Sequence, residues 1–147
     1  MGPFSRASAL ADRLRPAAPL LLRLTVGLVF LHHGLGKLHM GVPGVAGFFG
    51  SLGIPLPTLS AVVVMTVETI GAACVVLGLW TRLWAALMAV DMAVAILLVA
   101  LPSGHSPEIE GLLLAGALAL VGLGDGPLAL GALLRRAGPG TGTGVDR

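Results

Sequence analysis

The sequence predicts an all-α, polytopic membrane protein, a bundle of four transmembrane helices with both termini cytoplasmic. Of its 147 residues, 56% are hydrophobic and only 11% are charged, and its mean hydropathy is +0.97. A water-soluble domain of this size rarely has such a composition, because its surface must be wetted. Four apolar runs are separated by two stretches that contain glycine and proline and by one tight turn, Trp80-Thr81-Arg82. We therefore expect a multi-pass protein of the cell membrane with no separate soluble domain.

The first 19 residues form a basic N-terminal segment whose arginines and leucines fall on different sides of a helix. This segment is either a short interfacial helix on an anionic membrane face or a frayed basic leader. The apolar run from Leu20 to Gly36 follows it. This run is longer than a signal-peptide core, and no small-x-small cleavage site follows it, so we expect an uncleaved first transmembrane helix.

One stripe on this first helix begins and ends with a cation. Its members recur at spacings of four, three, four and three residues, which places them on a single face: Arg23, Gly27, Phe30, Gly34 and Lys37. Glycines on such a stripe let another helix backbone come close. His33 lies on the flank of the stripe, whereas His32 points nearly the opposite way.

Residues 41–57 hold many glycines and end in Gly53-x-Pro55-x-Pro57, which predicts a loop. Within it, four apolar side chains fit one face of a short helix on the membrane surface: Val45, Phe48, Phe49 and Leu52. The alternative is that these are loop residues folded over the bundle.

The second span, Ala61–Leu79, has one acid, Glu68, close to its middle. A carboxylate near the bilayer midplane is costly unless it is protonated or paired, so Glu68 is a candidate functional residue. Gly71 and Gly78 follow on the same face at helical spacing, which predicts close helix packing there. A tight turn, Trp80-Thr81-Arg82, then makes the second and third helices antiparallel neighbours.

The third span, Leu83–Leu101, has Asp91 near its centre. The fourth run, Ile109–Leu123, has 15 residues and covers only about 22 Å, so it spans a thinned region or recruits flanking turns. For residues 128–147 the sequence predicts an interfacial segment followed by a disordered tail. The arginines fall on one side of this arrangement and Lys37 on the other, so the positive-inside rule places both termini in the cytoplasm.

The buried charges suggest specific partners. Arg23 and Glu68 could form an intramembrane pair that either fixes helix register or leaves Glu68 to accept a proton or a quinol hydroxyl. Asp91 has three alternatives: it shares a proton with Glu68, it pairs with His33, or it bonds a threonine hydroxyl such as that of Thr66 or Thr69.

Several chemistries are disfavoured. His32 and His33 are adjacent and point about 100° apart, so both do not easily ligate one metal, and we expect no metal or haem site. His39 and His105 with Glu108 could bind an ion in the outer loops, although solvated loop residues are the simpler interpretation. The single cysteine, Cys74, excludes an internal disulfide and a C-x-x-C pair. Nucleic acid is not a predicted partner, because no basic cluster is interleaved with aromatic residues.

The combined pattern resembles the DoxX family of small four-helix membrane proteins over roughly residues 20–130. The stripe of the first helix carries the resemblance, together with these motifs: Phe48-Phe49…Leu52-Gly53-Ile54-Pro55, Glu68-x2-Gly71, Gly78-x3-Arg82, Glu110-x-Leu-Leu-Leu and Gly124-x-Gly126. The sequence departs from the family at Asp91 and at Pro127 and Ala129. The resemblance implies a four-helix membrane domain over residues 20–127. Some relatives resemble the small membrane subunit of thiosulfate:quinone oxidoreductases, and others are described as membrane partners of redox enzymes.

Three classes of function follow from these features. The first is a non-autonomous membrane subunit or partner of a redox enzyme, with quinone as a candidate cofactor and a protein partner or second copy of the chain beside the lipid bilayer. The second is a small transporter or proton pathway that uses Glu68 and Asp91. The third is a structural scaffold in a membrane complex. Catalysis by the chain alone is disfavoured, because the sequence has no cysteine pair, haem ligand set or nucleotide loop.

Overall fold

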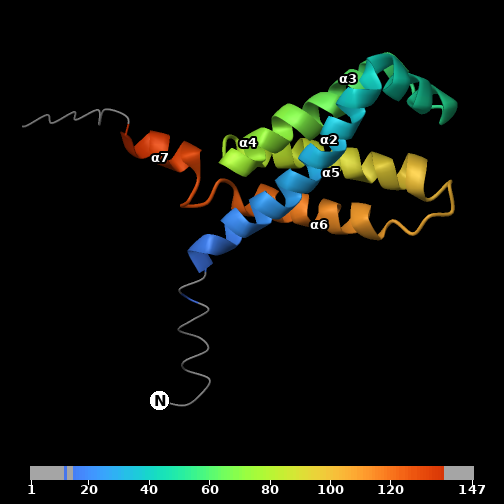
Figure 1. The fold of residues 1–147 in the computed structure, drawn as a ribbon. Helices are drawn as coiled ribbons and strands as arrows, with labels where there is room; N and C mark the ends of the chain where they lie inside the picture. Colours follow the sequence, from blue (N-terminus) through green and yellow to red (C-terminus); the bar gives the residue numbers. More distant parts are fainter. Residues whose placement is uncertain (1–11, 13–14, 138–147) are drawn as a thin grey trace, which may run out of the picture.

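The structure, a computed structural model, describes Asp12 and residues 15–137 (Figure 1). Every regular element among these residues is a helix, and none of them lies in a strand. The elements in chain order are η1 (Arg15–Ala17), α2 (Ala18–Ser51), α3 (Pro57–Thr66), η2 (Val67–Gly71), α4 (Ala72–Leu77), α5 (Thr81–Ala95), η3 (Ile96–Ala100), α6 (Glu108–Leu123) and α7 (Leu130–Ala137). Most of the predicted N-terminal segment and the predicted disordered tail lie outside the described residues.

Within the described part of the chain, three helices are long and apolar enough to cross a membrane: Arg15–Ser51, Pro57–Leu77 and Thr81–Ala100. The second consists of α3, η2 and α4, where the π-helical η2 joins two α-helical parts, and the third consists of α5 and the π-helical η3 that ends it. The prediction of an all-α membrane protein is confirmed. α6 has 16 residues, which gives about 24 Å of rise against about 30 Å of hydrocarbon.

The predicted loop over residues 41–57 is wrong for most of its length. α2 continues to Ser51 through a kink at Gly41, whose φ of 70° and ψ of 162° are not helical. Glycine reaches a positive φ without steric cost, so the chain bends there and a second helical segment starts. Beyond the kink, Val45 and Phe49 are buried against Ala61 and Met65 of α3. The short helix predicted here is therefore present, but its face packs over the bundle, as the alternative expected. Burial of Val45 and Phe49 keeps residues 42–51 helical.

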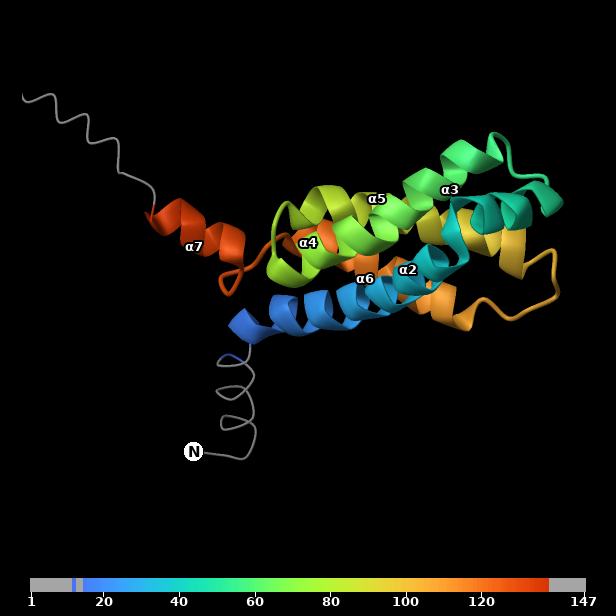
Figure 2. The same cartoon turned by 45° about the horizontal axis from the view of Figure 1, so that its top comes forward.

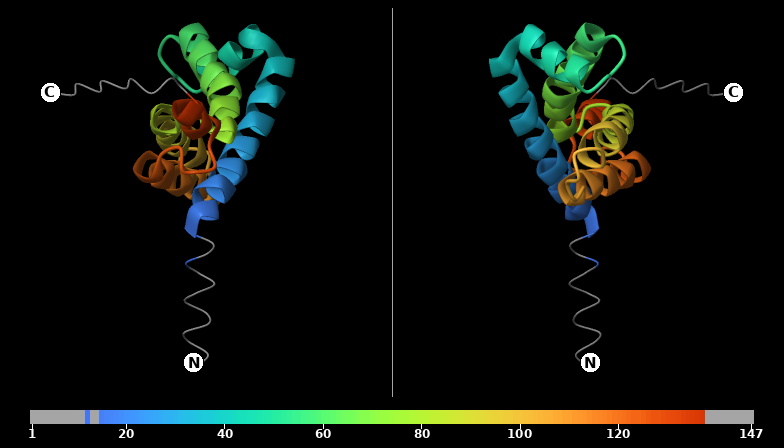
Figure 3. Two further views of the ribbon diagram at one scale, coloured as in Figure 1. Left: turned by 90° about the vertical axis from the view of Figure 1, so that its left-hand side faces the viewer. Right: turned by 90° about the vertical axis from the view of Figure 1, so that its right-hand side faces the viewer.

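The helices pack as two antiparallel pairs. α2 lies along α3, η2 and α4, whereas α5 lies along α6 (Figures 1 and 2). The two pairs meet where α5 packs against η2 and α4, and where the start of α2 lies beside α6 (Figure 3). The main core fills this junction, and its largest buried members are Phe30, Val75, Met88 and Leu120.

Large apolar side chains also cover the outside of the bundle. On α2, Leu21, Leu28 and Leu35 recur every seven residues and are all exposed. On α5, Leu83 and Val90 repeat the pattern. Exposed apolar stripes of this length are rare on water-soluble monomers and are the surface that a bilayer covers. The helices therefore contact lipid.

The two ends of the bundle differ. We call one the α2–α3 end, where residues 52–56 and 101–107 connect the helices. We call the other the α4–α5 end, where Gly78, with φ of 74°, ends α4, and the turn before α5 follows it. α5 packs against α4 directly after this turn, as the tight connection predicts.

Candidate functional site

The candidate site surrounds Glu68, which lies in the middle of the second long helix. Over η2 the hydrogen-bonding pattern changes from α to π, and single π-turns occur frequently at functional sites. Glu68 is only 3% exposed. A carboxylate in such a position needs a partner, because an unpaired buried charge is very costly.

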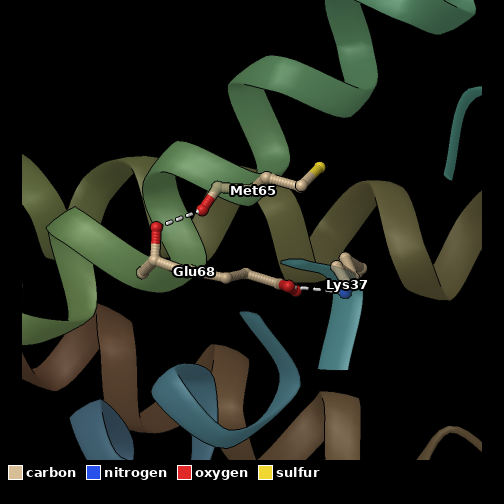
Figure 4. Close-up of polar contacts among 4 residues, drawn as sticks. Lys37, Met65 and Glu68 are labelled. Atoms are coloured by element: carbon tan, nitrogen blue, oxygen red, sulfur yellow. Dashed lines mark hydrogen bonds and ion pairs between the residues drawn. The ribbon is translucent and has the colours of Figure 1, made fainter. Parts of the chain in front are cut away.

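Lys37 is this partner. Its Nζ lies 2.5 Å from Glu68 Oε2, where it donates a hydrogen bond within an ion pair. Figure 4 shows the two side chains extended toward each other from α2 and η2. The Lys37 side chain keeps 26% of its surface exposed. The pair therefore joins a fully buried anion to a cation with some access to its surroundings.

The predicted pair between Arg23 and Glu68 is wrong. Arg23 is buried at the α4–α5 end of the bundle, where its Nη2 donates to the carbonyl of Leu128 at 3.1 Å. Gly34 is the α2 residue that lies against the backbone of Glu68. Arg23 comes eleven residues before Gly34, or about 16 Å along the helix axis, which is farther than a guanidinium stem extends.

Asp91 of α5 approaches the same ion pair from the other side. Its carboxyl group is in electrostatic contact with Glu68 and Lys37. Its Oδ2 is buried, with no hydrogen-bond partner among the described residues. The predicted alternative of a threonine partner is not found: among the described residues no hydrogen bond joins Asp91 to Thr66 or Thr69, whose hydroxyls each donate to a carbonyl of their own helix. Asp91 thus keeps an unsatisfied acceptor beside the pair.

These groups line one cavity of about 650 Å³. Most of its wall is apolar and comes from α2, α3, α5, η3 and α6. Its polar lining consists of His33, Lys37, Ser60, Glu68, Asp91 and Glu110. A largely apolar cavity with a few converging polar groups is the usual form of a small-molecule site, for which volumes of roughly 300–1,000 Å³ are typical.

The four glycines predicted to pack helices all lie at close contacts. A Cβ on Gly27 would meet Val76, and one on Gly34 would lie 2.5 Å from the carbonyl oxygen of Glu68. A Cβ on Gly71 would meet the Trp84 ring, and one on Gly78 would overlap the Arg23 guanidinium. The glycine stripe of α2 therefore faces the helix that bears Glu68.

A separate polar network holds the α4–α5 end together. Asp125 Oδ1 accepts a hydrogen bond of 3.0 Å from the backbone N–H of Thr81. This contact places a carboxylate at the N-terminus of α5, where the helix dipole favours it. Arg82 Nη2 donates to the carbonyl of Gly122 at 3.4 Å. Arg23 belongs to this network and not to the cavity.

Two contributing residues were missing from the predicted site. Glu110 lines the cavity, although its position at the entrance of the fourth run was visible in the sequence. Asp125 lies in a Gly-Asp-Gly-Pro stretch that indicated only a helix end, and its capping role depends on a contact 44 residues away. Among residues 15–137, no three His, Cys, Asp or Glu side chains come together as metal ligands.

Comparison with known proteins places this arrangement in a family. The family model described as DoxX matches residues 18–101. The chain belongs to the DoxX family. This DoxX protein is 40% identical over 113 residues to a Bacillus subtilis (strain 168) protein named "Putative oxidoreductase CatD", an alignment that covers 76% of this chain and 82% of the relative.

Two further relatives bear membrane-protein names. "Inner membrane protein YphA" of Escherichia coli (strain K12) is 38% identical over 68 residues, which are 46% of this chain and 48% of YphA. "Uncharacterized membrane protein Rv3486" of Mycobacterium tuberculosis (strain ATCC 25618 / H37Rv) is 37% identical over 99 residues, 65% of this chain and 61% of the relative. No solved structure matches the chain significantly.

Proposed function

We propose that this DoxX protein is a membrane subunit or partner of a redox enzyme complex, and that its cavity receives the ring of a membrane-dissolved quinone. The observation that carries the proposal is the cavity of about 650 Å³, in which an apolar wall faces an ion pair and a carboxylate oxygen that has no hydrogen-bond partner among the described residues. The name of the Bacillus subtilis relative supports a link to oxidoreductases.

The polar groups suit the head of a quinone. The Lys37 ammonium can donate to a quinone carbonyl, and the carboxylates of Glu68 and Asp91 can accept from quinol hydroxyls. The apolar wall suits the methyl-bearing ring and the start of its tail. The chain supplies binding groups but no cysteine pair for electron transfer, since Cys74 is its only cysteine. The electrons would therefore pass to a partner enzyme.

The topology that we propose has four crossings in the cell membrane and both termini cytoplasmic. α6 lies along α5 for its whole length in the views of Figures 1 and 2, so it shares the depth of a spanning neighbour. Its 16 residues would cross where the bilayer thins locally, a modest cost per ångström. Ser5→Cys and Thr141→Cys, each combined with Cys74→Ala, are labelled with a membrane-impermeant reagent in spheroplasts and in inverted vesicles to test the orientation. Labelling of the two positions from opposite sides would contradict it.

Quinone binding tests the functional proposal directly. The purified protein in nanodiscs is titrated with a fluorescent or spin-labelled ubiquinone analogue. We expect saturable binding that weakens at least tenfold in Glu68→Gln, since a lost hydrogen bond to a charged group is worth about 1.5–3 kcal/mol. Glu108→Gln is the matched control, because Glu108 is exposed and does not line the cavity. Absence of saturable binding, or equal affinity in Glu68→Gln and wild type, would contradict the proposal.

Partner association is the second half of the test. Mild-detergent purification of the tagged chain, followed by mass spectrometry of co-purifying proteins and lipids, should recover quinone together with an oxidoreductase. Recovery of a partner without quinone would instead favour a structural scaffold. Recovery of the chain alone, or of copies of itself, would leave no enzyme for it to serve and would contradict the partner role.

A small transporter or proton pathway is the second candidate. The buried Asp91 Oδ2 without a hydrogen-bond partner beside the Lys37–Glu68 pair favours it, because intramembrane carboxyl groups mark proton relays in many pumps. Proton flux into liposomes under a potential, lost in Asp91→Asn, would support this candidate. Equal flux in liposomes with and without protein would exclude it.

A further inference from the structure

The cavity has an opening whose position decides how a ligand reaches it. The candidates for the approach are the aqueous space beyond the α2–α3 end and the lipid beside the helices. Each approach requires a particular kind of residue at the opening, because a rim in water is polar and a rim in lipid is apolar.

The aqueous end of the cavity has a wall of apolar side chains. The helical segment beyond the Gly41 kink lies against α3 (Figure 3), and Phe48, Phe49 and Ile54 contribute to the cavity wall on this side. Phe49 is buried in its own small core with Val45, which holds the covering segment in place. A water-soluble ligand approaching from this end would meet apolar side chains, since Phe48 lines the cavity and is also 47% exposed.

The side of the cavity is open between α3 and α5. α3 packs mainly against α2. From η2 toward the α2–α3 end of the bundle, α3 diverges from α5 (Figures 1 and 2). Val63 of α3 and Val90 of α5 line the cavity and are nevertheless 51% and 62% exposed. Both belong to helices long and apolar enough to span the membrane. The rim that Val63 and Val90 form is therefore apolar, as a rim in the hydrocarbon must be.

From this arrangement we infer that the cavity opens sideways into the bilayer between α3 and α5, and that Asp91 is reached from the lipid. The ligand class that fits is a lipid-soluble molecule with a small hydrogen-bonding head and a flexible apolar tail. The head enters between Val63 and Val90 toward Asp91 and Glu68, while the tail stays among the acyl chains. The identity of the ligand as a quinone rests on the proposed function, but the sideways opening does not.

A lipid-soluble carbodiimide probes this opening without any natural ligand. Dicyclohexylcarbodiimide partitions into the bilayer, and a carboxylic acid adds across one of its C=N bonds to give an O-acylisourea. This product rearranges to a stable N-acylurea, or an amine such as that of Lys37 displaces the urea to give an amide. Both products are identified by peptide mass spectrometry, and no oxidant or reductant is involved.

The protein in proteoliposomes is treated with dicyclohexylcarbodiimide and, separately, with a permanently charged carbodiimide, in mildly acidic and in neutral buffer. We expect the lipid-soluble reagent to modify Asp91 and the charged reagent to leave it unmodified. Asp91→Asn should lose the modification at this position. Modification of Asp91 by the charged reagent, or by neither reagent in either buffer, would overturn the sideways opening.

Two neighbouring valines provide a matched pair of variants. Val63→Trp puts a large ring into the opening and should slow the modification of Asp91 several-fold. Val62→Trp is the control, because Val62 is 45% exposed on the same helix but does not line the cavity. Equal rates in the two variants, with circular dichroism showing both folded, would contradict the proposed route.

Protection by quinone separates this inference from the proposed function. Ubiquinone added to the liposomes should slow the modification of Asp91 if its ring occupies the cavity. Modification that Val63→Trp slows but ubiquinone does not would keep the sideways opening and contradict quinone as the ligand. Quinone binding with no selectivity between the two carbodiimides would keep the proposed function and contradict the opening.

Discussion

Removal of Lys37 should destabilise the protein more than removal of the glutamate that it pairs with. Lys37→Met leaves Glu68, which is 3% exposed, as an unpaired buried acid, and breaking a buried ion pair in this way costs about 3–5 kcal/mol. Glu68→Met leaves Lys37, whose side chain is 26% exposed and has a flexible stem that can turn toward the membrane surface. Its unsatisfied ammonium should cost only about 1–3 kcal/mol.

The double variant Lys37→Met/Glu68→Met completes the cycle. Replacement of a buried ion pair by apolar residues of similar volume is often neutral, so its stability should lie within about 1 kcal/mol of wild type. If the two single losses simply added, the double variant would lose about 4–8 kcal/mol. The difference between these outcomes gives a coupling energy of at least about 3 kcal/mol.

Reversible unfolding of the protein in mixed micelles, driven by increasing sodium dodecyl sulfate, measures these differences. Far-ultraviolet circular dichroism follows the helices, and Trp84, which contacts Gly71, reports on packing beside η2. Equal losses in the two single variants would refute the argument from unequal burial. Additive losses in the double variant would refute the ion pair itself.

Three further changes test other contacts by the same unfolding assay. Gly34→Ala places a Cβ against the Glu68 backbone and should lower the free energy of unfolding by about 1–3 kcal/mol. Gly36→Ala is the control, because the space around Gly36 is open, and it should be neutral or stabilise the protein by up to about 1 kcal/mol. Similar values for the two variants would refute the close approach of α2 to Glu68. Arg23→Ala should destabilise the protein by about 2–5 kcal/mol because it leaves a cavity. Arg23→Met fills most of this volume and should destabilise the protein less. Equal losses in the two variants would contradict a stabilising role for the volume of the Arg23 side chain. Asp125→Ala removes a cap from α5 and should cost about 1 kcal/mol, so an unchanged midpoint would contradict that role.

Residue periodicity and length were enough to predict most of the fold. The second and third spans were expected at Ala61–Leu79 and Leu83–Leu101, and they are observed at Pro57–Leu77 and Thr81–Ala100. Long apolar runs specify such helices because each must satisfy its own backbone hydrogen bonds in lipid. The continuation of α2 beyond Gly41 was not predictable in this way, since local glycines and a proline indicate a break, whereas the packing of Phe49 keeps the segment helical.

The candidate site was only partly predictable. Periodicity placed the acid of the second helix and the stripe of the first helix on facing sides, but it did not give the register between the two antiparallel helices. That register depends on where the connection after α2 ends, and the helical extension to Ser51 changes it. The spacing of residues in the sequence does not indicate the two π-turns, because a π-turn is stabilised by the packing of neighbouring helices.

Gly34 links the packing of the bundle to the chemistry of the site. The absence of a side chain there brings α2 against the Glu68 backbone, and Lys37 follows three residues later on the same face of the helix. The lysine stem then needs to extend along only one helical turn for its Nζ to reach the Glu68 carboxylate. Arg23, on the same stripe but three turns away, has no such reach. Close helix packing at one glycine therefore selects which of the two cations on the stripe pairs with the buried acid.

The π-turn that bears Glu68 has a second effect on the same region. A π-turn inserts one extra residue into the helix, so the faces before and after it are rotated relative to each other. After the π-turn α4 packs against α5, whereas before it α3 packs mainly against α2. Toward α5, the helix thus packs closely after Glu68 and leaves space before it. A single local distortion places the buried acid at the base of the cavity and lets α3 diverge from α5, which is the geometry that a ligand entering from the lipid requires.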